Sequence, residues 1–212
     1  MKLVKTLFIL MLISSSLVAQ TTRSDVFVNT NKVTWLGLDF TEAKFLGDRE
    51  RYGSESDMRK LLEAWNNFFI IEADKYNIAA CIDRPKVEKE ISVTLDHNGE
   101  LDVLAMYSDS ERDYLHLSRD GVSEIVSSYD FKGLSGIGLM FNIESFSKIN
   151  VEGSMWITFI DLESKEVLFT ERMFAPPAGF GVKNYWAGSI YKVMEKIKKT
   201  EFEMWRKKFY RP

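Results

Sequence analysis

Three strand patterns follow one another between Gly136 and Phe174, and they constrain the fold more than any other feature. Apolar, β-branched and aromatic residues fill the runs 137–143, 155–161 and 167–170, and the turn segments 148–150 and 163–165 separate them. Strands joined by such short turns pair with their neighbours in antiparallel order. We therefore predict a three-strand meander, against which the helices of the chain must pack.

One strand and one helix are predicted before this meander. The run 33–40 is rich in β-branched and aromatic residues on both faces, a pattern that is typical of an interior strand. Ser54 is followed three residues later by Asp57, and this pair predicts a helix start. Apolar residues then recur at helical spacing to about Tyr76, namely Met58, Leu61, Leu62, Trp65, Phe68 and Phe69.

A hairpin and two further helices complete the predicted elements. The run 87–95 alternates with a period of two, 101–107 is a second short apolar segment, and Asn98-Gly99 between them favours a tight hairpin turn. Ser118 opens a shorter helix that extends through Val126. After the breaker loop 175–181, apolar residues from position 186 to position 205 predict a final amphipathic helix.

This order of elements predicts an α/β fold, an α+β sandwich in which a mixed, partly antiparallel sheet packs against about three helices. The chain is 45% hydrophobic and 13% aromatic, which is enough to bury a core in one domain. We place this single globular domain at residues 32–212. Residues 20–31 are polar and predict a loose leader ahead of it.

The first nineteen residues have the pattern of a secretory signal peptide. Lys2 and Lys5 form a positive start, an apolar run follows at 7–12, and small residues lead to Ala19. The apolar run is shorter than the roughly 20 residues that a membrane-spanning helix needs, and we predict no transmembrane segment. Gln20 stands where a lipoprotein would have cysteine. We expect an exported protein, periplasmic or secreted, that is not a lipoprotein.

The net charge and the cysteine content exclude few classes of function. Without Lys2 and Lys5 the 28 basic residues become 26, against 31 acidic ones, so the mature net charge is -5. An exported acidic domain is a poor fit for nucleic acid. Cys81 is the only cysteine and lies in an apolar run, so we predict a buried side chain; an intermolecular disulfide and a reactive thiol are the alternatives.

A glycine-rich loop before the last helix is the strongest local motif. Gly179, Gly181, Lys183 and Asn184 are candidate ligand-binding residues, because free backbone amides at a helix start beside a lysine can hold an anion. The spacing matches neither the dinucleotide fingerprint nor the P-loop. The alternative is a sharp turn in which Asn184 caps the helix and the following aromatic residues fill the core.

The sequence offers little for metal or hydrolytic chemistry. His97 and His116 are the only histidines and have no zinc-ligand spacing around them, and the acidic run 96–102 departs from a calcium loop. We expect His97 to be a solvated turn residue, and we expect no metal and no cofactor. A serine hydrolase built from Ser135 and His116 stays open, since such sites assemble in space.

Two pairs of carboxylates stand close together in the sequence: Glu42 with Asp48, and Asp109 with Glu111. Such pairs do acid and base work only where burial separates their pKa values. We interpret both as solvated surface charges and assign no catalytic residue.

The last segment is basic and aromatic. It holds eight basic residues, namely Lys192, Lys196, Lys198, Lys199, Arg206, Lys207, Lys208 and Arg211. Lys198, Lys199, Trp205, Arg206 and Phe209 form a candidate surface for anionic lipid or for a partner. This interpretation requires Trp205 and Phe209 to face solvent. The alternative is a helix whose apolar stripe covers the sheet and whose outer face is solvated.

Several of these segments carry a resemblance. The runs 35–40, 155–161 and 179–188 resemble a group of uncharacterised exported proteins of Gram-negative bacteria. More distantly, the element order is similar to the α/β fold of the TolB amino-terminal domain and of CsgG-type outer-membrane assembly proteins, in which a hairpin like 161–168 precedes the last helix. The resemblance implies a scaffold or binding domain of the cell envelope and carries no catalytic residue.

These observations lead to one functional hypothesis and two alternatives. The first is a non-enzymatic periplasmic or secreted binding or assembly module whose partner is another envelope protein. The second is a hydrolase of unrecognised type. The third is a peripheral membrane binder that uses the basic C-terminal helix.

Overall fold

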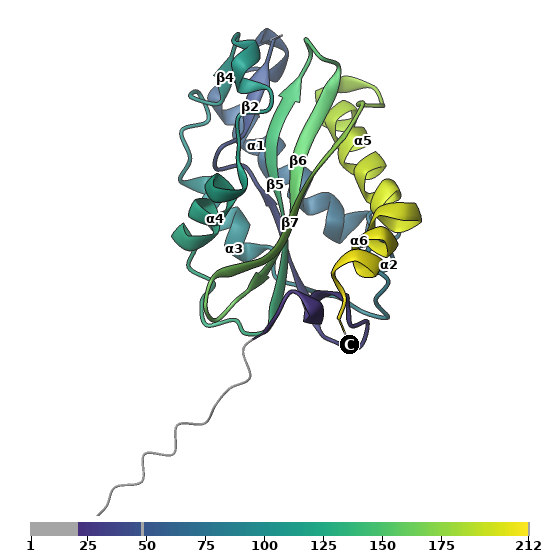
Figure 1. The fold of residues 1–212 in the computed structure, drawn as a ribbon. Helices are drawn as coiled ribbons and strands as arrows, with labels where there is room; N and C mark the ends of the chain where they lie inside the picture. The colour runs from purple at the N-terminus through teal and green to yellow at the C-terminus, as the bar shows by residue number, and fades with distance from the viewer. Residues whose placement is uncertain (1–20, 48, 212) are drawn as a thin grey trace, which may run out of the picture.

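Seven strands form one twisted sheet in the part of the chain that this computed structural model describes, residues 21–47 and 49–211 (Figure 1). The predicted signal peptide, 1–19, lies outside the described residues. The strands are β1 (Val33–Asp39), β2 (Lys44–Leu46), β3 (Glu88–Lys89), β4 (Tyr107–Ser108), β5 (Ile137–Ser147), β6 (Glu152–Asp161) and β7 (Glu166–Ala175). The predicted α/β class is confirmed.

Strand β5 is the centre of the sheet. On one side it pairs in parallel with β1 along its first half and with β2 along its second half, and β3 and β4 extend the sheet from these two strands. On its other side β5 pairs antiparallel with β6, and β6 pairs antiparallel with β7. The turns predicted at 148–150 and 163–165 join these last three strands.

Helices cover both faces of the sheet. They are α1 (Glu55–Ile71), α2 (Ile78–Cys81), α3 (Ser92–Gly99), α4 (Arg119–Ser128), α5 (Gly181–Lys196) and α6 (Phe202–Phe209), with a π-helical turn at Ile197–Glu201 between the last two. One face carries α1, α5 and α6 over the larger apolar cluster, and the other carries α3 and α4 over a smaller one (Figure 1). Among the described residues, no helix is both long enough and apolar enough to cross a membrane.

The predicted helix starts are confirmed. The Ser54 side chain accepts from the Asp57 N–H while Asp57 accepts from the Ser54 N–H, so the two residues form a capping box at α1. Ser118 caps α4 by accepting from the N–H of Gly121 at 3.1 Å. Helix α1 ends at Ile71, earlier than the expected end near Tyr76.

The hairpin predicted around Asn98-Gly99 is wrong. Only Glu88 and Lys89 form a strand there, and 92–99 is helix α3. Val93, Thr94 and Asn98 are buried at helical spacing, and two of these three side chains are polar. The period-two pattern places Thr94 on the polar face of a strand, whereas the structure buries it on a helix.

Their burial is explained by β1. This strand bulges between Trp35 and Gly37, and β3 ends before the bulge. Side chains replace the missing neighbour: Asn66 accepts from Leu38 N–H at 2.7 Å and donates to Leu38 C=O at 3.0 Å. Asn98 accepts from Phe40 N–H at 3.0 Å, and Thr94 donates to the C=O of residue 36 at 2.5 Å.

Gly37 is required at this bulge. Its φ is +109°, and a Cβ there would lie 2.4 Å from Thr94 Oγ1 and 2.5 Å from Asn66 Oδ1. The close approach that lets the two side chains reach the backbone therefore leaves no room for any side chain on residue 37.

The segment predicted as a loose leader is packed against the domain. Residues Ser24–Phe27 form a 3₁₀ turn in which Val26 and Phe27 are buried. The Phe27 ring contacts Phe169 with centroids 5.5 Å apart, and Ser24 Oγ donates to the C=O of Arg211 at 2.9 Å. The ordered domain therefore begins before Lys32, because two apolar residues within a polar segment reach the core.

We expect Asn66→Leu to lower the free energy of unfolding by about 1–3 kcal/mol, because the buried Leu38 N–H loses its acceptor. Urea unfolding measures the change. Asn67→Leu is the matched control on the same helix, since the side-chain hydrogen bond of Asn67 goes to the exposed Glu63 at 3.5 Å and not to the β1 backbone; we expect a change within about 0.5 kcal/mol. Equal effects of the two substitutions would contradict the role assigned to Asn66.

Asp161 at the β6–β7 turn predicts a pH dependence. Partial burial acts to raise the pKa of its carboxyl. The Ser164 N–H, the Thr21 and Ser164 side chains and the Glu163 N–H together outweigh burial and hold the pKa below its ordinary value. A lowered folded pKa contributes stability that is present above the unfolded pKa of about 3.9 and is lost as the pH falls through the folded value.

We therefore expect Asp161→Asn to cost about 1 kcal/mol at pH 7, because the amide oxygen still accepts the N–H hydrogen bonds but without the charge. Urea unfolding of both proteins at neutral pH and below the folded pKa tests this. The difference should shrink at low pH, and an unchanged difference would contradict the assignment.

Candidate functional site

A β-bulge in the central strand places two polar side chains on one face. The register between β5 and β6 shifts between Ile143 and Ser145, so Glu144 is the extra residue. Successive side chains of a regular strand point to opposite faces. Here both Glu144 and Ser145 reach the same segment, residues 113–117, which crosses the sheet before α4.

Glu144 is fully buried and accepts hydrogen bonds on both oxygens. Leu117 N–H donates to Oε1 and Ser154 Oγ donates to Oε2, each at 2.7 Å. Arg172 on β7 binds both oxygens, with Nη2 3.0 Å from Oε1 and Nε 2.9 Å from Oε2. The guanidinium also donates to the C=O of Leu117. Residue 117 is therefore held through both its N–H and its C=O.

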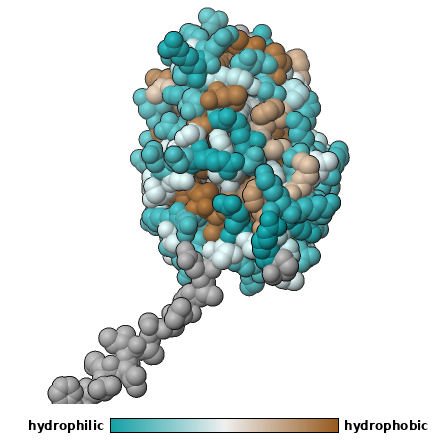
Figure 2. All heavy atoms as spheres, in the orientation of Figure 1, coloured by the Kyte–Doolittle hydropathy of each residue, from teal (hydrophilic) through white to brown (hydrophobic). Residues whose placement is uncertain are grey.

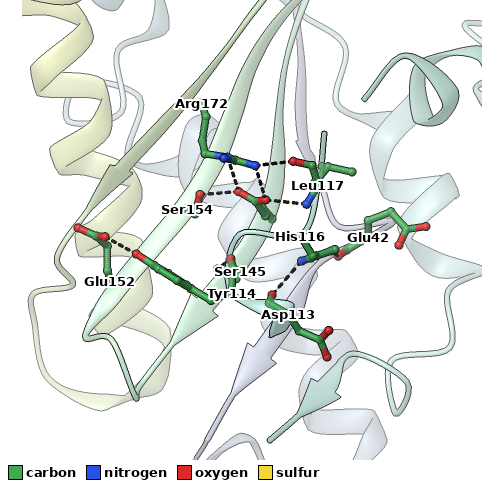
Figure 3. Close-up of polar contacts among 10 residues, drawn as sticks. Glu42, Asp113, Tyr114, His116, Leu117, Ser145, Glu152, Ser154 and Arg172 are labelled. Carbon is green, nitrogen blue, oxygen red and sulfur yellow. Dashed lines mark hydrogen bonds and ion pairs between the residues drawn. The ribbon is translucent and has the colours of Figure 1, made fainter. Parts of the chain in front are cut away.

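The rest of the crossing segment is fixed in the same way. Ser145 Oγ donates to the C=O of Tyr114 at 2.7 Å, and the Tyr114 hydroxyl donates to Glu152 (Figure 3). Burial, followed by the hydrogen bond to Glu152, raises the pKa of Tyr114. His116 has Nδ1 2.8 Å from the C=O of Asp113 and Nε2 3.0 Å from the C=O of Glu42. The segment is thus fastened to β5, to β6 and to the β1–β2 connection.

These contacts define what the arrangement can do chemically. A carboxylate offers about four lone-pair sites. Those of Glu144 accept three hydrogen bonds, from Leu117 N–H, Ser154 Oγ and Arg172 Nη2, and Arg172 Nε adds an ion-pair contact at 2.9 Å. Both His116 nitrogens face backbone carbonyls. Both Glu144 oxygens and both His116 ring nitrogens thus make contacts within the protein. We interpret the cluster around Glu144 as a structural latch for the crossing segment.

A second polar track runs across the same face. Asp39 is fully buried and accepts from Tyr129 Oη at 2.7 Å, from Asn142 Nδ2 at 2.9 Å and from Thr41. Thr158 Oγ1 donates to Asn142 at 2.7 Å and lies 2.9 Å from the Thr170 hydroxyl. Burial, followed by the charge of Asp39, raises the pKa of Tyr129. This track links β1, β5, β6 and β7.

A cavity of about 460 Å³ lies beside the latch. It is lined by Thr41, Glu42, His116, Leu117, Ser118, Gly121, Glu124, Ile125 and Ser128. Its walls carry hydroxyl groups and two carboxylates over an apolar floor of residues 117 and 125. The cavity has room for a small polar molecule, but the His116 ring at its edge is already committed to backbone carbonyls.

The hydrolase pair considered from the sequence is not assembled. Ser135 is exposed in the turn before β5, whereas His116 lies beside Leu117, which bonds Glu144 far along β5. From residue 136 to Glu144 a strand spans roughly 25 Å. The distance along β5 therefore keeps Ser135 and His116 apart. Asp109 and Glu111 are exposed, and Asp48 lies outside the described residues.

The candidate ligand-binding loop forms a sharp turn. Gly179 and Gly181 have φ values of +115° and +75°, and α5 begins at the second of them. Asn184 donates back to the C=O of Phe180 at 3.2 Å from within the helix, and it does not occupy the capping position. The Lys183 ammonium lies 5.4 Å from the centroid of the Phe68 ring. Anion binding here stays a prediction.

The candidate C-terminal surface does not present its aromatic residues to solvent. Trp205 is 6% exposed, and Phe209 is half-buried with its ring stacked near Phe27 at 6.3 Å. Lys198 and Lys199 are exposed, and Arg206 pairs with Asp83 at 2.6 Å. The lipid-binding interpretation requires Trp205 and Phe209 to face solvent, and Trp205 does not, because the apolar stripe of the helix covers the sheet as the alternative predicted.

The remaining candidates have structural positions. Cys81 is buried as predicted, its Sγ lies 3.4 Å from the C=O of Met194, and burial raises the pKa of the thiol. His97 belongs to α3 and stacks on Tyr129 with centroids 4.1 Å apart, so it is not a solvated turn residue. Within residues 21–47 and 49–211, no three His, Cys, Asp or Glu side chains gather as a metal site would require.

Sequence reasoning missed the latch and the polar track. One signal was available: Glu144 is a lone charged residue inside the apolar run 137–146, and Asp39 ends another such run. A buried charge needs a partner, so both positions indicate a hydrogen-bonded or ion-paired carboxylate. The partner Arg172 could not be identified from the sequence, because β7 reaches Glu144 only through the fold.

Comparison with known proteins gives no family. No family model matches the chain, and no curated protein matches it. Among solved structures, a dodecameric PelC variant from Paraburkholderia phytofirmans is similar with a TM-score of 0.28 at 12% identity, over 82% of this chain and 88% of that one. A Helicobacter pylori protein described as a neuraminyllactose-binding hemagglutinin homologue has a TM-score of 0.25 at 9% identity, over 84% and 83%. Both scores are too low to indicate a function.

We expect Glu144→Ala to lower the free energy of unfolding by about 3–5 kcal/mol, because it leaves Arg172 and the Leu117 N–H without their acceptor. Arg172→Ala should cost less, since that side chain is 29% exposed. A double-mutant cycle by urea unfolding tests the pair. The free energy lost in the double variant should be about 1–3 kcal/mol smaller than the sum of the losses in the two single variants.

Glu163→Ala, which removes an exposed carboxylate at the β6–β7 turn, is the matched control and should change stability by less than about 0.5 kcal/mol. Hydrogen exchange at the Leu117 amide should accelerate in Glu144→Ala. Additive costs in the cycle, or an unchanged exchange rate, would show that Glu144 and Arg172 do not act as one latch.

Proposed function

We propose that this protein is an exported, non-enzymatic binding or assembly module of the cell envelope that engages a protein partner by adding a strand to its sheet. The observation that carries the proposal is the outer edge of β7. Within the described residues this ten-residue strand pairs only with β6, and it lies at the open edge of the sheet (Figure 1). Exposed strand edges are a common docking surface for extended segments of partner proteins.

The hydrogen bonds of β7 identify which backbone groups are outward. The C=O groups of Thr170 and Phe174 accept from side chains of α4 and α5, so they point away from β6. In an antiparallel pair the N–H and C=O of one residue point to the same side. The N–H of Phe174 is therefore also outward, and the Phe174 side chain is 45% exposed.

Three further observations support the proposal. Both nitrogens of His116 contact backbone carbonyls, and Ser135, the other side chain considered for catalysis, is exposed at the far end of β5. The pattern of residues 1–20 favours export. The resemblance to envelope assembly proteins implies a binding domain. The hydrolase and membrane-binding alternatives have no comparable feature among the residues described.

Crosslinking pull-down from native envelope fractions tests the proposal, with the mature chain from Gln20 as bait. We expect Phe174→Pro to lower capture of the partner about ten-fold, because proline removes the outward N–H that an added strand needs while leaving the β6 ladder intact. Phe174→Ala is the matched control, since it removes the ring but keeps the N–H, and it should lower capture less than about three-fold.

Circular dichroism and urea unfolding verify that both variants fold. Equal capture by the parent and Phe174→Pro would contradict strand addition at this edge. A failure of the parent to retain any protein partner at about 0.15 M salt would contradict the binding function itself.

A further inference from the structure

Cations hold three carbonyls of β7 that point away from β6, those of Leu168, Thr170 and Phe174. Arg23 Nε donates to the C=O of Leu168 at 3.0 Å, the Arg119 guanidinium donates to that of Thr170, and Lys196 Nζ donates to that of Phe174 at 2.7 Å. From residue 168 to residue 174 the edge is roughly 20 Å long. The free edge is therefore a row of positive charges, which we name the basic edge.

The cations come from both faces of the sheet. Arg119 belongs to α4 on one face, and Lys196 belongs to α5 on the other. A strand added to β7 would direct alternate side chains to these two faces. Acidic side chains on either face of that strand would thus meet a cation. Glu171 is the acidic residue of the edge, and Arg119 already pairs with it at 2.6 Å.

The basic edge leads into a groove of about 750 Å³ between the end of β7 and the α5 helix. Its lining consists of Ala175, Pro176, Tyr191, Lys192, Glu195, Lys196, Lys199 and Thr200, three lysines against one glutamate. Lys192 Nζ lies 3.4 Å from the C=O of Pro177, and Lys199 pairs with Glu195 at 2.8 Å. The π-helical turn Ile197–Glu201 lies beside this groove, and such turns are frequent at functional sites.

We propose that the basic edge and its groove receive an extended acidic segment of a partner protein, a proposal that rests on strand addition at β7. An ammonium group has three donors and a carbonyl uses one of them. Carboxylates accept charged hydrogen bonds more strongly than carbonyls do. The cations therefore move from the β7 carbonyls to the carboxylates of the incoming segment, and the freed carbonyls accept its backbone N–H groups.

The geometry favours a protein segment over a lipid surface. The aromatic residues that would insert into lipid, Trp205 and Phe209, pack inward. The face that contains β7 is largely hydrophilic with separate hydrophobic patches (Figure 2). A row of cations along a strand edge with a concave end matches an extended chain, and it repels a basic one.

Fluorescence anisotropy of a fluorescein-labelled peptide of valine, threonine and glutamate tests the proposal. Two matched peptides carry glutamine or lysine in place of every glutamate. We expect the mature protein to bind the acidic peptide at least about ten-fold more tightly than the glutamine peptide. The double variant Arg119→Gln/Lys196→Gln should lose about ten-fold in affinity for the acidic peptide.

Lys207→Gln/Lys208→Gln removes the same charge from the exposed face of α6 and is the control, with an expected loss under about two-fold. Lack of acidic-peptide binding by the parent, equal binding of all three peptides, or equal losses in both double variants would overturn the proposal. So would binding to vesicles of zwitterionic and anionic phospholipid without binding to the peptide.

One outcome separates this inference from the proposed function. Suppose that Phe174→Pro abolishes capture of the envelope partner while Arg119→Gln/Lys196→Gln binds the peptide and captures the partner like the parent. Strand addition at β7 is then supported, and the proposal that the added segment is acidic is contradicted. If the double variant instead self-associates in size-exclusion chromatography and the parent binds no acidic peptide, the cations serve only to block edge pairing, and the proposal is wrong.

Discussion

The ion pair between Glu144 and Arg172 connects the central strand β5, the edge strand β7 and the crossing segment 113–117. Strand β5 supplies the carboxylate from a bulge, the edge strand β7 supplies the guanidinium, and the crossing segment supplies both backbone groups of Leu117. A buried carboxylate is stable only when its charge and all its lone pairs are matched. The position of the crossing segment is therefore tied to the position of the edge strand.

The polar track beside this pair has the same effect on the other strands. From Asp39 through Asn142 and Thr158 to Thr170, hydrogen bonds pass from β1 to β7, and Arg119 then holds the C=O of Thr170. Networks of this kind rigidify a core when every member is satisfied. A rigid edge loses little conformational freedom when a partner strand is added, so more of the interaction energy remains as affinity.

The sequence predicted what depends on periodicity and local caps, and it failed where polar groups are buried. The meander at 137–170 and the start at Ser54 follow from apolar spacing and a capping box. The sequence pattern predicts a strand where helix α3 forms, because Thr94 and Asn98 bond to backbone groups of residues 36–40, and these contacts exist only after folding. Glu144 is a lone charge within an apolar run, a signal that sequence reasoning missed, and its partner on β7 is identified only by the fold.

The basic edge follows from a conflict that every open sheet faces. Unpaired N–H and C=O groups invite pairing with any extended chain, including further copies of the same protein. Cations that hold three of the β7 carbonyls reduce this liability for neutral strands, since an added N–H must displace a charged donor to bond any of these carbonyls. An acidic strand supplies a better acceptor for that donor at the moment of exchange. The same three side chains that protect β7 from indiscriminate pairing thereby select the charge of the segment that can pair.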